Sequence, residues 1–296
     1  LESGKTTWMQ VDGDPRMHYI PRMEWAANSD EIVFQRMNRL QNTLWIMLGD
    51  AKTGSTKAIF TEKESAWISV TRDFRWMDGG KKFTWTTESD GWRHVYLISR
   101  DGKTKTLVTK ESFDVIRVQK IDIKGGWLYF TASPENPTEV YLYRTRLDAS
   151  GKAERITPAN LPGVHNYNIS NDGNYAFHSF SSFETPSVTN LVSLPDNKIL
   201  KKIVENNNLK TAIAKIKKPQ VEFFKVDAAG VELDAWMMKP YNFDSNKKYP
   251  ILVFVYGEPA SQTVMNRFGG SRYLWNTLLT QKGYIIVSMD SRGTPG

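Results

Sequence analysis

The sequence has no cysteine among its 296 residues. This absence excludes disulfide frameworks, cysteine-ligated zinc, iron–sulfur clusters and thiol catalysis. It leaves the compartment open, because many secreted bacterial proteins also lack cysteine. Long apolar runs are missing as well: the longest, 251–256 and 284–287, fall far short of the about 20 residues that a membrane-spanning helix needs. We therefore expect no membrane span in this chain.

A leader segment is also absent from the start. Residues 1–5 contain neither a start methionine nor an apolar stretch. This predicts that the chain begins as a trimmed or processed piece. If the parent protein is secreted, its signal has been removed.

Motifs for metals, phosphates and nucleic acids are missing too. The four histidines lie far apart without ligand spacing, and Gly269-Gly270-Ser271 is too short for a phosphate loop. The net charge of +7 comes from scattered basic residues, whose densest cluster, within 210–218, is short. We therefore expect no metal, no cofactor and no nucleic-acid partner, and interpret the charge as a solvated basic surface.

The sequence does contain a repeat of about 48 residues. Each copy has an apolar strand, a polar turn, an aromatic-rich strand, a glycine turn and a short strand that ends in threonine. The turn glycines are Gly54, Gly102 and Gly151, and the closing threonines are Thr61, Thr109 and Thr157. The predicted strands are 31–35, 43–48 and 57–61, then 82–86, 93–98 and 105–109, then 126–131, 139–143 and 153–157. A looser fourth copy has a turn and strand at 171–178, a strand at 188–194 and a degenerate last strand.

This repeat predicts one four-stranded antiparallel sheet per copy, arranged as the blades of a β-propeller. A β-sandwich with coincidental spacing is the alternative. Four blades do not readily close a ring, which favours further blades before Leu1. We assign the tryptophans of this region to blade cores rather than to a recognition stripe: Trp67, Trp76, Trp85 and Trp92.

The last third of the sequence changes character. Residues 199–218 break the strand pattern and predict a linker with a short amphipathic helix. A hairpin at 221–226 and 231–238 follows, then an apolar strand at 249–255, a helix at 268–282 and a strand at 284–289. The helix's apolar positions are Tyr273, Leu274, Leu278 and Leu279. Fully apolar strands around a helix are typical of the opening of a doubly wound α/β domain with a covered sheet. We therefore predict propeller blades over 1–218 and a truncated α/β domain over 219–296.

The motifs of both regions together resemble the prolyl oligopeptidase superfamily, and within it the bacterial form of the dipeptidyl peptidase IV branch. They are Lys248-Tyr249-Pro250, Val255-Tyr256-Gly257-Glu258-Pro259, Ser261-Gln262-Thr263-Val264 and Asp290-Ser291-Arg292-Gly293, with Asn38–Asn42 and Ser89–His94 in the blades. The resemblance implies a mainly β chain: about four later blades of an eight-bladed propeller, then the first strands and helix of an α/β-hydrolase domain. It also implies a serine exopeptidase that removes a dipeptide from peptides with a free N-terminus, after Pro or Ala. A periplasmic or secreted homodimer is expected on the same ground.

The catalytic triad is not in this sequence. An α/β-hydrolase carries its serine in Gly-x-Ser-x-Gly, followed by Asp and then His. No such motif occurs, and His18, His94, His165 and His178 all lie in the propeller region. We place the triad beyond Gly296 and expect this chain alone to be inactive.

One catalytic part remains, by resemblance. Tyr256 follows the apolar strand where hydrolases build the oxyanion hole, and its hydroxyl is the expected oxyanion donor; the alternative is a tyrosine that caps the strand. Arg39, Arg72 and Arg292 are substrate-binding candidates, each weighed against an ordinary ion pair. Asp290 is interpreted as a turn residue. The adjacent Glu-Glu pair with which the family holds the substrate ammonium does not occur here and is expected before Leu1.

Other functions stay open. The chain could belong to a propeller that serves as a binding scaffold, or to a pseudo-peptidase that has lost its nucleophile. Within the enzymes, an oligopeptidase or acyl-peptide hydrolase is the alternative.

Overall fold

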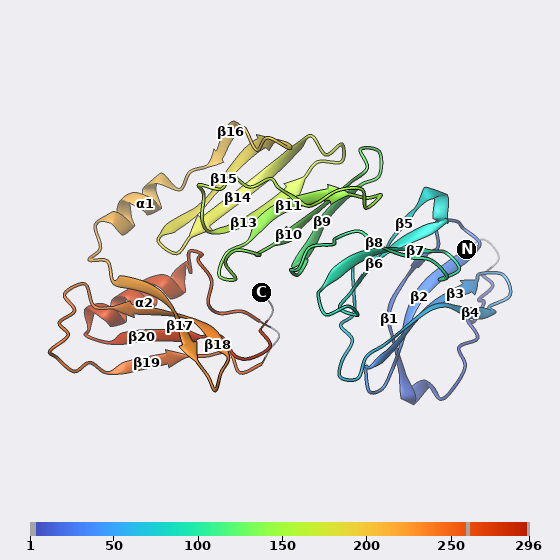
Figure 1. The fold of residues 1–296 in the computed structure, drawn as a ribbon, viewed down its shortest axis with the longest axis horizontal. Coiled ribbons are helices and arrows are strands. Elements are labelled where there is room, and N and C mark those ends of the chain that lie inside the picture. Colours follow the sequence, from blue (N-terminus) through green and yellow to red (C-terminus); the bar gives the residue numbers. More distant parts are fainter. Residues whose placement is uncertain (1–3, 259–260, 295–296) are drawn as a thin grey trace. The chain divides into compact units, whose positions relative to one another are not determined.

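The computed structural model describes residues 4–258 and 261–294. Within these ranges the strands form five four-stranded sheets, accompanied by the α-helices α1 and α2 and two short 3-10 turns, Pro15–Met17 and Asp78–Gly80 (Figure 1). The chain divides into two compact units. The first runs to Lys110 and includes Asp148–Ser150, and the second contains the rest.

The first unit consists of two antiparallel sheets with sequential strand order. One sheet contains β1 (His18–Trp25), β2 (Glu31–Asn38), β3 (Thr43–Asp50) and β4 (Thr56–Lys63). The other contains β5 (Arg75–Met77), β6 (Lys82–Thr87), β7 (His94–Ser99) and β8 (Lys105–Leu107). Leu44 and Ile46 of the first sheet and Phe83 and Trp85 of the second are buried in one shared core. This is the arrangement predicted for neighbouring blades.

The second unit contains two more sheets of the same design (Figure 1). One contains β9 (Arg117–Asp122), β10 (Trp127–Ala132), β11 (Tyr141–Arg146) and β12 (Glu154–Arg155). The other contains β13 (Val164–Ile169), β14 (Tyr175–Ser182), β15 (Thr185–Ser193) and β16 (Ile199–Val204). Tyr129 and Leu142 of one sheet pack with Tyr167 and Val192 of the other. The chain is therefore mainly β, with four-stranded sheets of the propeller type.

Two features of these sheets differ from the sequence analysis. The first strand of each sheet, β1, β5, β9 and β13, was not located by the repeat. In addition, residues 199–204 form the regular strand β16 rather than part of a linker, and the predicted short helix starts only after it, as α1 (Asn207–Ala214). All six side chains of β16 are exposed, and its apolar residues stand in pairs on either side of Lys201 and Lys202 instead of alternating with polar ones. The strand therefore lacks the period-two pattern of a half-buried strand.

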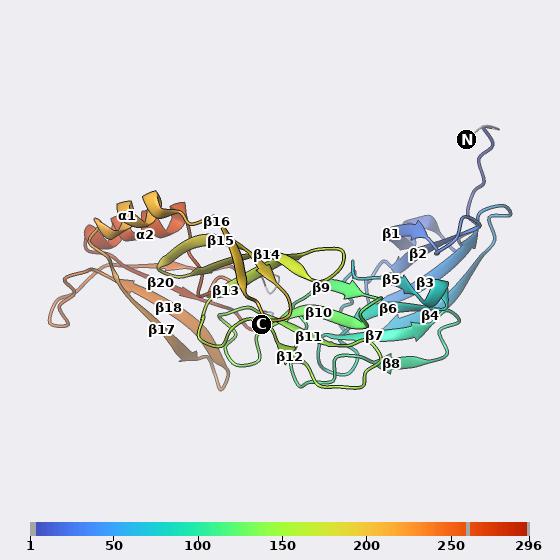
Figure 2. The ribbon, with the colours of Figure 1, turned by 90° about the horizontal axis from the view of Figure 1, so that it is seen from above.

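The last sheet has mixed topology, in the order β17-β18-β20-β19. The predicted hairpin forms β17 (Gln220–Asp227) and β18 (Glu232–Lys239), and β19 (Ile251–Phe254) runs parallel to β20 (Ile285–Met289). Ile213 of α1 and Tyr273 of α2 (Ser271–Gln281) pack with Trp236, Met238 and Ile286. Both helices therefore lie on one face of this sheet, as Figure 2 shows.

Two details of this sheet were predicted wrongly. Helix α2 buries Tyr273, Asn276, Thr277 and Thr280, whereas Leu274 and Leu278 are exposed. Among the residues that the structure describes, β19 is an edge strand, and its Ile251, Leu252 and Val253 are exposed rather than covered as expected.

The division at residue 218 stays a prediction. The compact units are separated near Lys110, and the second spans the last two blades together with the mixed sheet.

Candidate functional site

Tyr256 lies two residues beyond the end of β19. Phe254, the last residue of β19, pairs with Ser288 of the parallel strand β20. Parallel strands place their carboxyl ends at one edge, which is where open α/β sheets bind ligands. The Tyr256 side chain is 39% exposed, and its hydroxyl donates a hydrogen bond of 3.4 Å to Glu258. The structure thus places Tyr256 exposed at the carboxyl edge of the parallel strand pair, and its role as oxyanion donor stays a prediction. Pro259 of its motif lies outside the described residues.

Asp290 holds residues 263–264, which belong to the connection from β19 to α2 that also contains Tyr256. Its carboxylate accepts hydrogen bonds from Thr263 N (2.7 Å), from Thr263 Oγ1 (2.8 Å) and from Val264 N (3.2 Å). Its own N–H donates to Asp234 O on β18 at 3.0 Å. Asp290 therefore joins a loop to a sheet, a larger role than the turn residue expected from the sequence.

The same loop is attached to a propeller sheet of its own unit. Gln262 Nε2 donates to Pro137 O at 2.7 Å, and Asn266 N donates to Thr138 O at 2.7 Å. Asn266 Nδ2 also donates to the buried carboxylate of Glu139 at 2.7 Å. Residues 262–266 thus bridge the β10–β11 connection and the carboxyl edge of β19 and β20.

Arg292 lies at this edge too, but its guanidinium is engaged locally. It donates to the carbonyl oxygens of Ala228 and Ala229, at 3.0 and 3.4 Å, in the turn between β17 and β18. Beside it is a cavity of about 290 Å³, lined among others by Gln262, Asp234 and Asp290. These contacts give Arg292 a structural role, and its contact with substrate stays a prediction.

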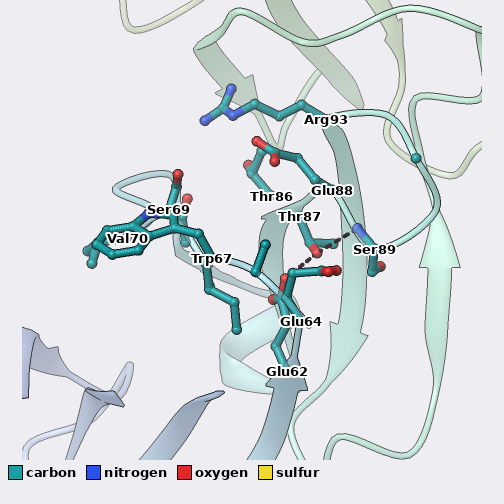
Figure 3. Close-up of a pocket in the computed structure, with 14 residues that line it drawn as sticks. Glu62, Glu64, Trp67, Ser69, Val70, Thr86, Thr87, Glu88, Ser89 and Arg93 are labelled. Carbon is teal, nitrogen blue, oxygen red and sulfur yellow. Dashed lines mark hydrogen bonds between the residues drawn. The ribbon is translucent and has the colours of Figure 1, made fainter. Parts of the chain in front are cut away.

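The first unit contains a separate acidic pocket of about 450 Å³ (Figure 3). Glu62, Glu64, Glu88 and Trp67 line it. Figure 3 shows Thr87 between Glu62 and Ser89, hydrogen-bonded to both. Glu62 also accepts a hydrogen bond from the Trp85 indole, and Glu64 accepts two from Ser65. The carboxylates of Glu62 and Glu64 are therefore already engaged in hydrogen bonds within the protein.

Arg39 and Arg72 both lie in the first unit and are exposed. The Arg39 guanidinium stacks on the Tyr19 ring, 5.1 Å from its centroid, and donates to the Tyr19 hydroxyl. Arg72 follows Thr71, which lines the acidic pocket. Neither arginine is brought together with Tyr256 or Arg292 within one compact unit, and both substrate roles stay predictions.

The assignment of the tryptophans needs correction. Trp85 is 1% exposed and Trp76 packs against the same core, as expected for a blade. Trp67 is 55% exposed and lines the acidic pocket, and Trp92 is exposed as well. Trp67 lies in 64–74, a connection between two sheets. Its place outside every predicted strand could have distinguished it from the core tryptophans.

Residues 4–258 and 261–294 contain no group of three His, Asp or Glu side chains arranged to hold a metal ion. In the same part of the chain, neither α-helix has the length and apolar character needed to cross a membrane.

Comparisons with known proteins agree with the resemblance. A family model described as "Dipeptidyl peptidase IV (DPP IV) N-terminal region" matches residues 1–187. A "Probable dipeptidyl-aminopeptidase B" of Coccidioides posadasii is 28% identical over 285 residues, covering 91% of this chain and 30% of that protein. Its namesake from Emericella nidulans is 29% identical over 300 residues, covering 96% and 32%.

Among solved structures, Porphyromonas gingivalis dipeptidyl peptidase 4 matches with a TM-score of 0.86 at 25% identity, covering 96% of this chain and 40% of that one. The chain spans about a third of the length of the curated relatives that it matches. Because the family model covers more than half of the sequence, the chain belongs to the dipeptidyl peptidase IV branch of the prolyl oligopeptidase superfamily.

Proposed function

We propose that the protein carrying this chain is a serine exopeptidase that releases dipeptides from a free N-terminus, with Pro or Ala preferred at the second position. Family membership supports the peptidase class. The observation that carries the site assignment is the position of Tyr256, just past β19 at the edge where the parallel strand β20 also ends.

The proposed mechanism is acyl transfer through an acyl-enzyme. The Tyr256 hydroxyl donates a hydrogen bond to the oxygen that becomes negative as the nucleophile attacks the peptide carbonyl. A positioned donor of this kind lowers the barrier by about 3–4 kcal/mol. The Ser, Asp and His come from outside residues 1–296, so this chain alone is inactive.

Among the three arginines, Arg72 has surroundings that suit substrate binding best. It is exposed and follows Thr71, a residue that lines the acidic pocket, whereas Arg39 is stacked on Tyr19 and Arg292 is held at a turn. We also propose a secreted or periplasmic homodimer, on the family resemblance.

The test is a substrate panel assayed with the complete gene product that contains this sequence. We expect release of p-nitroaniline from Ala-Pro- and Ala-Ala-p-nitroanilide, and no release when the amino terminus is acetylated. Cleavage of the acetylated compounds would indicate an acyl-peptide hydrolase, and cleavage inside longer peptides an oligopeptidase. Absence of hydrolysis with every substrate would favour a binding scaffold or a pseudo-peptidase.

A further inference from the structure

The hydroxyl group of Tyr256 already has an acceptor two residues further along the chain. Its oxygen lies 3.4 Å from Glu258 Oε2, and both residues are exposed just beyond the carboxyl end of β19. In the part of the chain that the structure describes, Glu258 is the only hydrogen-bond partner of this hydroxyl, and no cation forms an ion pair with the Glu258 carboxylate. The proposed oxyanion donor therefore lies beside a carboxylate that has no counter-ion.

A tyrosine hydroxyl has a single proton to donate. An ionised carboxylate is a stronger acceptor than the uncharged carbonyl oxygen of a bound peptide, because hydrogen bonds to charged groups are about twice as strong as neutral ones. The hydroxyl should therefore stay directed at Glu258 until the attacked carbonyl oxygen becomes negative. At 3.4 Å the contact is long for an O–H···O bond, so the proton can be released during the reaction at a modest cost.

We propose that Glu258 opposes the oxyanion donor by competing for the hydroxyl proton of Tyr256. This inference rests on the proposed function, in which Tyr256 is that donor. No covalent bond changes in the step: the O–H group turns from the Glu258 carboxylate to the oxygen of the tetrahedral intermediate, and the proton stays on Tyr256. The contact with Glu258 stabilises the bound ground state and is lost in the transition state, so it raises the barrier between them. Glu258 thus lowers kcat at the same edge where Tyr256 raises it.

The test measures kcat and KM for Ala-Pro-p-nitroanilide with variants of the complete gene product. Glu258→Ala removes the acceptor and its charge, and we expect kcat to rise about two- to tenfold while KM changes less than about twofold. Glu258→Gln keeps an uncharged acceptor of nearly the same size and should give a smaller rise. Asp244→Asn is the matched control, because it removes a carboxylate charge from a turn that precedes β19, and its kcat should equal that of the wild type. Damage to the fold lowers kcat, so a rise is not explained by a structural role.

A double-mutant cycle shows whether Glu258 acts through Tyr256. The Tyr256→Phe enzyme has no hydroxyl proton, so adding Glu258→Ala should leave its kcat unchanged. The cycle is measured in 1 M NaCl, where a Debye length of about 3 Å suppresses direct repulsion between the exposed Glu258 charge and the oxyanion. An equal rise in both backgrounds would show that Glu258 acts as a charge alone, and it would overturn the inference.

The remaining outcomes separate this inference from the proposed function. If Tyr256→Phe lowers kcat but Glu258→Ala and Glu258→Gln leave it at or below the wild-type value, the competition is refuted and the oxyanion assignment stands. If Tyr256→Phe itself keeps the wild-type kcat, the oxyanion assignment in the proposed function fails, and this inference fails with it.

Discussion

Gly54, Gly102 and Gly151 occupy equivalent places in the repeat, but their surroundings differ. Gly102 has φ +73°, and a Cβ there would lie 1.8 Å from Ile59 O. Gly54 has φ +75°, with Trp8 O at 2.1 Å from the same position. At Gly151, a Cβ would meet only Arg146 Cγ, at 3.7 Å. The spacing of 48 and 49 residues therefore locates the turns, but it does not show which glycines the backbone requires.

Substitution of these glycines should separate the two cases. Gly102→Ala places a methyl group on a backbone carbonyl in a left-handed conformation, and we expect the free energy of unfolding to fall by about 3 kcal/mol or more. Gly151→Ala should change it by less than about 1 kcal/mol. Urea unfolding midpoints measure both, and similar losses for the two variants would contradict this account.

Two histidines form a stacked pair inside the sheet β13–β16. His165 Nδ1 lies 2.8 Å from His178 Nε2, and the rings are 5.1 Å apart. The other ring nitrogen of His165 lies 2.9 Å from Leu161 O. Burial lowers the pKa of His165 to about 4 and that of His178 to about 3, the latter also because His165 is its neighbour. The pair is neutral at pH 7 and belongs to the core rather than to a catalytic site.

The pair should make the fold sensitive to acid. Unfolded histidines titrate near pH 6.5, above both folded values, so between pH 6.5 and about 4 the unfolded chain binds more protons. The contribution of the pair to the free energy of unfolding is therefore fully present above pH 6.5. It falls with the pH by about 1.4 kcal/mol per pH unit for each additional proton that the unfolded chain binds. Melting temperatures from pH 7 to 4 should show this slope, and His178→Phe should reduce it. A slope that His178→Phe leaves unchanged would contradict the assignment.

At the scale of elements, strands with a clear apolar pattern in the sequence were predictable, whether buried as in β6 or exposed as in β19, and strands without one were not. The predicted strand 82–86 is β6, whose side chains after Lys82 are all buried. In β1, seven of the eight side chains are exposed, and β5 has only three residues, so neither carries an alternating pattern long enough to recognise. The buried face of α2 was predicted only in part. Tyr273 is buried as expected, but the other buried positions include the polar residues Asn276 and Thr277, which a search for apolar residues does not find.

The bridge at residues 262–266 could not be foreseen from the sequence. Asn266 and Glu139 are 127 residues apart, and their contact depends on how a blade meets the mixed sheet. Glu139 also accepts a hydrogen bond from Tyr141, and burial together with this bond raises the pKa of Tyr141 to about 12. The bridge therefore contains the buried carboxylate of Glu139, which is stabilised by hydrogen bonds from Asn266 and Tyr141.

Removal of the Asn266 side chain should weaken the second unit. Asn266→Ala deletes the donor to Glu139 Oε1 and the acceptor of the Phe183 N–H, so the Phe183 N–H loses its partner and Glu139 keeps only the hydrogen bond from Tyr141. We expect a loss of about 2–4 kcal/mol in the free energy of unfolding and faster hydrogen exchange at the Phe183 amide. Asn246→Ala, at an exposed turn, is the control and should change little. Equal exchange at Phe183 in both variants would refute the bridge.

At the scale of the whole molecule, order along the chain predicted more than composition did. The order of the predicted elements, with blades first and then an apolar strand, a helix and a second strand, put Tyr256 just after the apolar strand. The structure has it there, at the carboxyl edge of β19. The role of Asp290 could not be predicted, because its contacts with Thr263 and Val264 arise only after β19 and β20 pair. The acidic pocket was not predicted, because Glu62 lies on β4 of one sheet and Glu88 follows β6 of the other.

The most direct test of the account is kcat for dipeptide release by the complete gene product with Tyr256→Phe. Loss of the oxyanion donor should lower kcat by about 10²- to 10³-fold with a folded, monodisperse enzyme. Tyr241→Phe is the matched control: Tyr241 is 41% exposed in the same unit, its hydroxyl accepts a hydrogen bond from Lys217, and its loss should leave kcat unchanged. A Tyr256→Phe enzyme as active as the Tyr241→Phe enzyme would contradict the central claim.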